Sequence, residues 1–159
     1  MSKQEPIKAM EIHGEKKKIV LAGNPNVGKS VFFNSLTGIY VDVSNFPGTT
    51  VDVSHGHFEE YAVIDTPGVY GISSFNDEEK VARDVILTAD LIVNVVDAVH
   101  LERDLFLSLQ VIETGIPTII VLNMMDDAKR EGLKIDLALL EEQLGVPVIP
   151  AVAIKGKGL

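Results

Sequence analysis

The sequence predicts an α/β domain in which a mixed, mostly parallel sheet carries helices on both faces. Apolar, β-rich runs alternate with helical patterns from residue 18 onward, and such alternation is typical of parallel strands joined by helical crossovers. A glycine-rich loop also stands between the first strand and the first helix. The length of 159 residues and the hydrophobic content of 46% suit one domain with a sizeable core.

The expected elements follow one another in a single series. Apolar runs with β-branched residues predict the strands, and apolar positions three to four residues apart predict the helices. The series is strand 18–23, helix 29–38, strand 51–58, strand 61–65, helix 78–89, strand 91–97, helix 102–114, strand 117–123, helix 136–144 and strand 147–150. Only Glu59 and Glu60 join the second strand to the third, so we expect an antiparallel hairpin there and one antiparallel edge strand.

Composition limits the classes of function. The net charge of −9 opposes non-specific binding to nucleic acid or to an anionic membrane surface, so we expect no nucleic-acid partner. The absence of cysteine excludes disulfides and thiolate metal sites. The sequence has no signal-peptide layout and no apolar run of about 18 or more residues, so we expect this fragment to be soluble. Residues 1–15 are polar without a sustained period, and we expect a loose leader before a domain at 16–159.

A phosphate-binding loop is the most specific motif. Residues 23–30 are Gly-Asn-Pro-Asn-Val-Gly-Lys-Ser, with a predicted strand before them and a predicted helix after them. In this setting backbone N–H groups and the positive end of the helix dipole face the phosphates, Lys29 reaches the β and γ oxygens, and Ser30 ligates Mg²⁺. The predicted nucleotide-binding residues are Gly23, Asn24, Pro25, Asn26, Val27, Gly28, Lys29, Ser30 and Val31.

A second motif, at residues 123–126, predicts which base is bound. Asn123, Met124 and Asp126 directly follow the predicted strand 117–123. The Asp126 carboxylate can accept hydrogen bonds from N1–H and the 2-amino group of guanine, whereas adenine offers no such pair of donors. Alone, this short motif is matched as well by a solvated turn with a helix cap. After a phosphate loop and a strand, it favours guanine.

A third motif, Asp65-Thr66-Pro67-Gly68, ends the predicted strand 61–65. Asp65 is placed to hold a water molecule on Mg²⁺, and the N–H of Gly68 is placed to meet a γ-phosphate. We include Thr66 and Pro67 among the nucleotide-binding residues, with a plain β-turn as the alternative interpretation.

The order of these motifs resembles the translation-factor-related GTPases over nearly all of residues 18–159. Within that class, segments 23–30, 33–38, 43–51, 64–70, 78–84 and 123–126 resemble the cytosolic G domain of the FeoB family of ferrous iron transport proteins. The resemblance implies a P-loop GTPase G domain that binds GTP and GDP with Mg²⁺.

The resemblance also suggests a switch threonine in the segment Gly48-Thr49-Thr50. Aligned with the family motif, Thr50 ligates Mg²⁺ and senses the γ-phosphate in the GTP state. Thr49 is the rival, although a β-former entering the next strand accounts for it comfortably. Gly48, Thr49 and Thr50 are all expected to contact the nucleotide.

Val69 follows Gly68, where many GTPases carry a glutamine that orients the attacking water. A hydrophobic residue here resembles FeoB, Era and MnmE, in some of which K⁺ supplies the missing positive charge. An asparagine that contacts the ion in that subgroup corresponds to Asn26. We therefore expect slow, K⁺-stimulated hydrolysis with Lys29, Thr50, Gly68 and Asn26 as catalytic residues. The alternative for Asn26 is an amide that stabilises the loop.

The last base-binding motif matches least well. Val152 stands where relatives usually have serine, and Ala153 follows it. The backbone N–H of Ala153 can still meet the guanine O6, but Val152 lacks a hydroxyl to brace the loop, so we expect modest base affinity.

The resemblance implies partners outside this sequence. FeoB proteins continue into helical and membrane-embedded domains, which would place this domain at the cytoplasmic face of the cell membrane. The sequence ends before the last helix that such G domains pack on their sheet, so we expect a truncated domain that self-associates through the uncovered apolar face.

Three functions follow from these expectations. The first is a GTP-hydrolysing switch that gates Fe(II) transport. The second is a soluble Era- or MnmE-like GTPase acting in ribosome or tRNA maturation, which the acidity of the chain disfavours. The third is a regulatory module that binds nucleotide and hydrolyses little. His55 and His57 alternate along a predicted strand, and we interpret them as part of a solvated strand face rather than as a metal pair.

Overall fold

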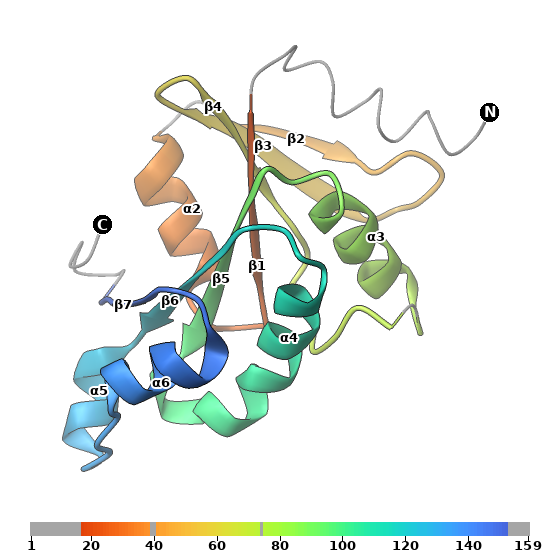
Figure 1. Ribbon diagram of the computed structural model, residues 1–159. Coiled ribbons are helices and arrows are strands. Elements are labelled where there is room, and N and C mark those ends of the chain that lie inside the picture. The colour runs from red at the N-terminus through yellow and green to blue at the C-terminus, as the bar shows by residue number, and fades with distance from the viewer. Residues whose placement is uncertain (1–16, 39–40, 74, 153–159) are drawn as a thin grey trace.

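The computed structural model describes residues 17–38, 41–73 and 75–152, and within them seven strands form one sheet in the order β2-β3-β4-β1-β5-β6-β7. Helix α2 covers one face of the sheet, and α3 and α4 cover the other (Figure 1). The predicted fold class is therefore confirmed.

The elements have the following bounds. The strands are β1 Lys18–Gly23, β2 Asp42–Asn45, β3 Asp52–Phe58, β4 Tyr61–Asp65, β5 Leu91–Asp97, β6 Thr118–Asn123 and β7 Val148–Pro150. The α-helices are α2 Lys29–Thr37, α3 Asp77–Ile86, α4 Leu101–Glu113, α5 Met125–Arg130 and α6 Leu137–Leu144, and a 3₁₀ turn, η2, covers Ala98–His100. All ten predicted elements are present, and the predicted hairpin is the antiparallel pair β3–β4.

Three short elements were not predicted. Strand β2 pairs antiparallel with β3 at the edge of the sheet, so the strand expected at the edge, β3, lies second. All four residues of β2 are exposed, and a strand that buries no side chain leaves no apolar pattern in the sequence. The helix α5 and the turn η2 have six and three residues, too few to establish a helical period.

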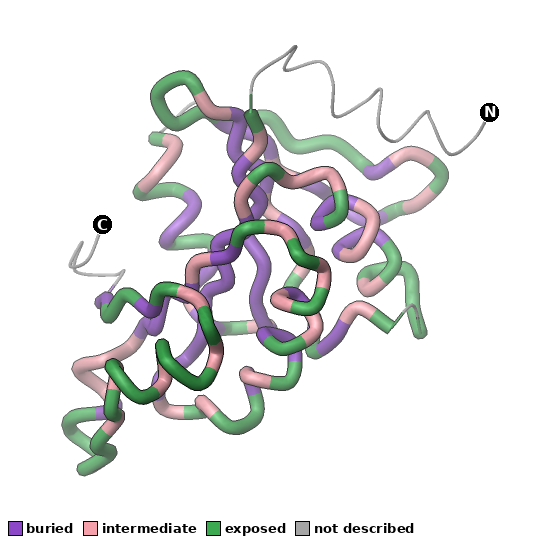
Figure 2. Tube along the Cα trace, in the orientation of Figure 1, coloured by how far each residue is buried: buried purple, intermediate pink, exposed green. Residues whose placement is uncertain are grey.

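The central strand β1 explains why both faces of the sheet need helices. Val20 and Ala22 pack with the cluster that includes Val85 of α3 and Leu107 of α4, while Leu21 packs with the α2 side. All of these side chains are fully buried, and the buried positions follow the middle strands in Figure 2. Each fully buried Val or Leu side chain contributes about 1.5–3 kcal/mol relative to exposure.

The parallel strands place the loops that carry the motifs. β1 pairs in parallel with β4 and β5, and β5 pairs in parallel with β6. The carboxyl ends of these strands therefore meet at the same edge of the sheet, where ligands bind in open α/β folds. The three predicted motifs begin at the carboxyl ends of β1, β4 and β6.

The interpretation of the two histidines on β3 was wrong for one of them. His57 is exposed, but His55 is buried, with 3% of its surface accessible. Burial lowers the pKa of His55 below its ordinary value of 6.5, and the negative charge of Asp42 offsets part of this effect. Among the described residues, no three His, Asp or Glu side chains gather as a metal-binding group.

Candidate nucleotide-binding site

A pocket of about 400 Å³ lies where β1 ends and α2 begins. Seven of its lining residues come from the phosphate loop and the start of α2, and the eighth comes from the loop after β4. They are Asn24, Pro25, Asn26, Gly28, Lys29, Ser30, Val31 and Gly68. The structure thus brings together two motifs that are far apart in the sequence.

Glycine is required at two positions, Gly28 and Gly68, because other residues approach them too closely to leave room for a side chain. Gly28 has a φ of 85°, and a Cβ atom there would lie 2.3 Å from Nδ2 of Asn123. A Cβ atom on Gly68 would lie 2.9 Å from Cα of Pro25. Any larger residue would push the loops apart, so both glycines set the shape of the pocket.

Lys29 lies inside the pocket and is 7% exposed. Its Nζ forms an ion pair with the Asp65 carboxylate and donates a hydrogen bond to the carbonyl oxygen of Thr66. Burial raises the pKa of the Asp65 carboxyl, and the charge and hydrogen bond of Lys29 offset part of that rise. The Asp65 motif and the phosphate loop are therefore joined by a charged contact as well as by shape.

A second pocket, of about 330 Å³, adjoins the first. It is lined by Gly28, Val31, Asn123, Met124, Asp126, Asp127, Arg130 and Val152. Gly28 and Val31 line both pockets, so the guanine-type motif and the phosphate loop share a boundary.

Two lining residues of the second pocket, Asp127 and Arg130, were missed by the sequence analysis. The guanidinium of Arg130 forms an ion pair with Asp127 and lies 3.9 Å from the carboxylate of Asp126. The only signal for Arg130 was its place three to four residues after two acidic residues, a spacing that brings side chains together once a helix is present.

A hydrogen bond joins the two loops directly. Nδ2 of Asn123 donates to the carbonyl oxygen of Val27 over 2.9 Å. The segment after β7 is also fixed to residues 123–126, here called the base loop, because the N–H of Met125 donates to the carbonyl oxygen of Ala151. Ala153, the predicted partner of guanine O6, lies outside the described residues.

The predicted switch residues Gly48, Thr49 and Thr50 are not among the residues that line either pocket. The hydroxyl of Thr49 donates to the carbonyl oxygen of Phe46 and accepts from the N–H of Val51, so it stabilises a local turn. Thr50 is exposed. Its role as a metal ligand stays a prediction.

Val69, directly after Gly68, points into the core. It is 4% exposed and packs in the cluster that contains Val20 and Ile64. Its N–H donates to the carbonyl oxygen of Gly23, which holds this segment against the phosphate loop. The Val69 side chain therefore cannot orient a water molecule in the pocket.

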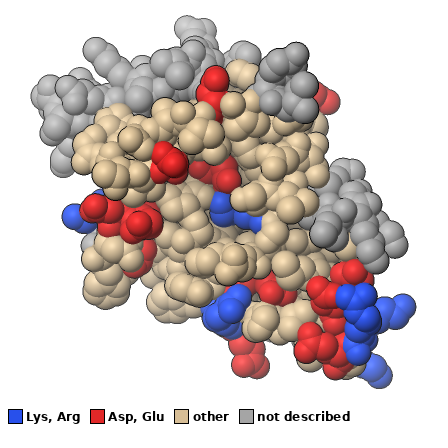
Figure 3. All heavy atoms as spheres, turned by 180° about the vertical axis from the view of Figure 1, so that it is seen from behind, with Lys and Arg blue, Asp and Glu red and all other residues tan. Residues whose placement is uncertain are grey.

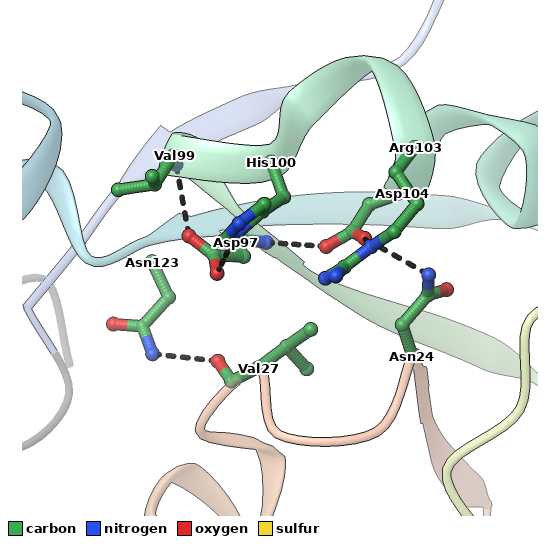
Figure 4. A network of polar contacts seen from close by, with 8 residues as sticks. All are labelled: Asn24, Val27, Asp97, Val99, His100, Arg103, Asp104 and Asn123. Atoms are coloured by element: carbon green, nitrogen blue, oxygen red, sulfur yellow. Dashed lines mark hydrogen bonds and ion pairs between the residues drawn. The ribbon is translucent and has the colours of Figure 1, made fainter.

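A polar network lies behind the phosphate loop (Figure 4). Asp104 of α4 accepts hydrogen bonds from Nδ2 of Asn24 and from the N–H of Asp97, both over 2.9 Å. Asp97 in turn accepts from the N–H of Val99 and contacts Nδ1 of His100. The sequence showed Asp104 only as an acid in the first turn of a helix, where it suits the helix dipole. That it is buried against the phosphate loop is a property of the tertiary structure.

Comparison with known proteins agrees with this geometry. Residues 17–159 match the family model of ferrous iron transport protein B. The chain is 42% identical over 155 residues to the Fe(2+) transporter FeoB of Shigella flexneri and to that of Escherichia coli (strain K12). These alignments cover 91% of this chain and 20% of each relative, so the chain spans about a fifth of the curated relatives.

Solved structures extend the comparison to the fold. A mutant of S. thermophilus NFeoB bound to GDP superposes with a TM-score of 0.86 at 46% identity, covering 89% of this chain and 58% of that one. The FeoB G-domain from Methanococcus jannaschii superposes with a TM-score of 0.76 at 42% identity, covering 90% of both chains. The chain belongs to the FeoB family and has the fold of the FeoB G domain.

Proposed function

We propose that this chain is a GTP-binding and slowly GTP-hydrolysing switch domain that couples its nucleotide state to Fe(II) transport by a longer protein. The observation that carries the proposal is the pair of adjoining pockets that share Gly28 and Val31. One contains a buried lysine and a helix N-terminus suited to phosphates, and the other contains a carboxylate suited to guanine.

The residues present fit Mg²⁺. Ser30 is exposed and lines the phosphate pocket, and the Asp65 carboxylate at the end of β4 contacts Lys29, which lines the same pocket. Hydroxyl and carboxylate oxygens are hard donors of the kind that Mg²⁺ prefers. Bound Mg²⁺ would neutralise phosphate charge, with Ser30 and Thr50 as direct ligands and Asp65 acting through water. Lys29 would exchange its contact with Asp65 for phosphate oxygens.

K⁺ stimulation rests on Asn26 and Val69. Asn26 is exposed and lines the phosphate pocket, so this residue is accessible to a ligand there. The position directly after Gly68 is occupied by the buried Val69, whose side chain cannot orient water. An added monovalent cation would supply positive charge in the transition state. Hydrolysis without it would be slow.

The partners of the domain are inferred from its relatives. Those relatives are named Fe(2+) transporters and are about five times the length covered here. Within the described ranges, none of the helices has the length and apolar character needed to cross a bilayer. We infer that a parent protein holds this domain at the cytoplasmic face of the cell membrane, next to helical and transmembrane domains. Self-association of the isolated chain is a further prediction.

Two other functions remain to be compared. The buried Val69 favours a module that binds guanine nucleotides and hydrolyses little until another domain activates it. An RNA-acting GTPase is disfavoured by the net charge of −9. On the face shown in Figure 3, basic side chains are interspersed with acidic ones and form no continuous stripe.

The test is hydrolysis of GTP and of ATP by the 159-residue chain in Mg²⁺ buffer, with K⁺ and then with Na⁺ in its place. We expect guanine-selective turnover that rises in K⁺, and loss of the K⁺ effect in Asn26→Ala. An Asn26→Ala variant with full K⁺ stimulation would refute the role of Asn26. GTP binding without turnover in either salt would support the binding module, and equal use of ATP would contradict the guanine assignment.

A further inference from the structure

One face of α4 contacts the segment that follows Gly68. This face contains Arg103 together with Phe106 and Gln110, which follow it by three and seven residues and therefore lie on the same side of the helix. Oε1 of Gln110 accepts a hydrogen bond from the N–H of Ile72 over 2.8 Å. The guanidinium carbon of Arg103 lies 5.9 Å from the centre of the Tyr70 ring, within range of a cation–π contact.

Gly71 completes this contact. A Cβ atom on Gly71 would lie 2.9 Å from Oε1 of Gln110 and 3.3 Å from the Phe106 ring. The segment 70–72 therefore lies directly on α4, and a displacement of one must be accommodated by the other.

Another side of the same helix contacts the phosphate loop. Asp104 is 2% exposed, and its Oδ1 accepts hydrogen bonds from Nδ2 of Asn24 over 2.9 Å and from Nε of Arg103 over 2.8 Å. A buried carboxylate is costly unless it is paired and hydrogen-bonded. Arg103 thus balances the charge of the group that holds Asn24.

Asn24 depends on that carboxylate for its position. It is 2% exposed and lines the phosphate pocket. Within the described part of the chain, its Oδ1 is buried without a hydrogen-bond partner, while its Nδ2 is bonded to Asp104. Figure 4 shows the side chains of Arg103 and Asn24 both next to the Asp104 carboxylate. Contacts run without a break from Tyr70 through Arg103 and Asp104 to Asn24.

We propose that Arg103, Asp104 and Gln110 are positioning residues that link segment 70–72 to the phosphate loop, so that α4 helps to distinguish a bound triphosphate from a diphosphate. The inference rests on the proposed function and on the prediction from the sequence that the N–H of Gly68 meets the γ-phosphate. The position of the residues just after Gly68 then depends on that phosphate. Arg103 and Gln110 hold those residues against α4, and Asp104 passes their position to Asn24. The affinities for the two nucleotides would therefore depend on the contacts from segment 70–72 through α4 to Asn24, as well as on the direct contacts with the γ-phosphate.

The experiment measures dissociation constants of the 159-residue chain for fluorescent GDP and for a fluorescent, non-hydrolysable GTP analogue in Mg²⁺ and K⁺. Arg103→Ala and Gln110→Ala are compared with Arg83→Ala. Arg83 is a matched control, because it also pairs with the aspartate that follows it, Asp84, but lies on α3. Gln110→Glu keeps an acceptor for the N–H of Ile72 and serves as the rescue variant.

We expect Arg103→Ala and Gln110→Ala to raise the ratio of the analogue constant to the GDP constant by about fivefold or more, the lower end of allosteric coupling. Arg83→Ala and Gln110→Glu should leave the ratio within about twofold of the wild-type value. A structural role alone would lower the unfolding temperature and weaken both nucleotides equally, and that result would overturn the inference. If the wild-type chain binds both nucleotides but the ratio is unchanged in Arg103→Ala and Gln110→Ala, only the coupling is refuted. A wild-type chain that binds neither would refute the proposed function itself.

Discussion

Replacing Gly28 by alanine tests whether the contact between the phosphate loop and the base loop holds the site together. The new Cβ atom would lie 2.3 Å from Nδ2 of Asn123, and no rotation of a methyl group relieves that overlap. Asn123 must therefore move, and its 2.9 Å hydrogen bond to the carbonyl oxygen of Val27 is lost. The substitution disturbs both pockets at once.

The cost has two parts, and Gly115→Ala separates them. A Cβ atom in the left-handed backbone region costs about 1–2 kcal/mol. Loss of the buried hydrogen bond from Asn123 to the carbonyl oxygen of Val27 costs about 1–3 kcal/mol more. Gly115 has a φ of 78° and nothing within 4 Å of the position of a Cβ atom, so its substitution incurs the first cost alone.

Urea unfolding of the nucleotide-free chain, together with GDP titration, measures both effects. Gly28→Ala should lose about 1–3 kcal/mol more unfolding free energy than Gly115→Ala. GDP should bind more weakly to Gly28→Ala and unchanged to Gly115→Ala. Equal losses of stability with equal GDP affinities would show that the Gly28–Asn123 contact does not support the site.

Three further predictions concern pH, base choice and metal. Because burial lowers the pKa of His55, the unfolded chain binds more protons than the folded chain below about pH 6.5. The free energy of unfolding should therefore fall as the pH drops from 7 to 5. The fall should be less steep in His55→Gln and as steep as in the wild type in the exposed control His57→Gln. Identical slopes in all three proteins would contradict this. Asp126→Ala should weaken GDP binding by roughly 10-fold or more and remove the preference for GDP over IDP, which lacks the 2-amino group; a retained preference in competition titrations would refute the guanine assignment. Chelation of Mg²⁺ by EDTA should weaken GTP binding much more in the wild type than in Ser30→Ala, and equal responses would exclude Ser30 as a ligand.

The fold could be predicted from local patterns because its main elements are long and apolar. β1 and β5 are almost wholly buried, and the two-residue connection between β3 and β4 leaves room for a hairpin only. β2 could not be found, because its exposed side chains carry no apolar signal. The burial of His55 was missed for a related reason: a polar residue on a strand does not show which layer will cover it.

The candidate site could be predicted as far as its motifs extend. The phosphate loop, Gly68 and the Asn123–Asp126 segment are brought together as the motifs require, because each follows a parallel strand of the same sheet. Asp104 and Arg130 could not be predicted, since an acidic or basic residue on a helix gives no sign of the loop it will contact. The residues from Gly48 to Thr50 line neither pocket, so their role depends on the ligand.

The central position of β1 in the sheet affects how the chain folds while it is being synthesised. β1 lies between β4 and β5, and its hydrogen-bonded partners are Ala62–Asp65 and Leu91–Val95. On the ribosome this apolar strand therefore emerges before both of its partners and cannot pair with them until they have been synthesised. Parallel pairing between distant segments is intrinsically slow and leaves apolar strands exposed to aggregation in the meantime. Productive folding of the nascent chain thus depends on how quickly β4 and β5 follow.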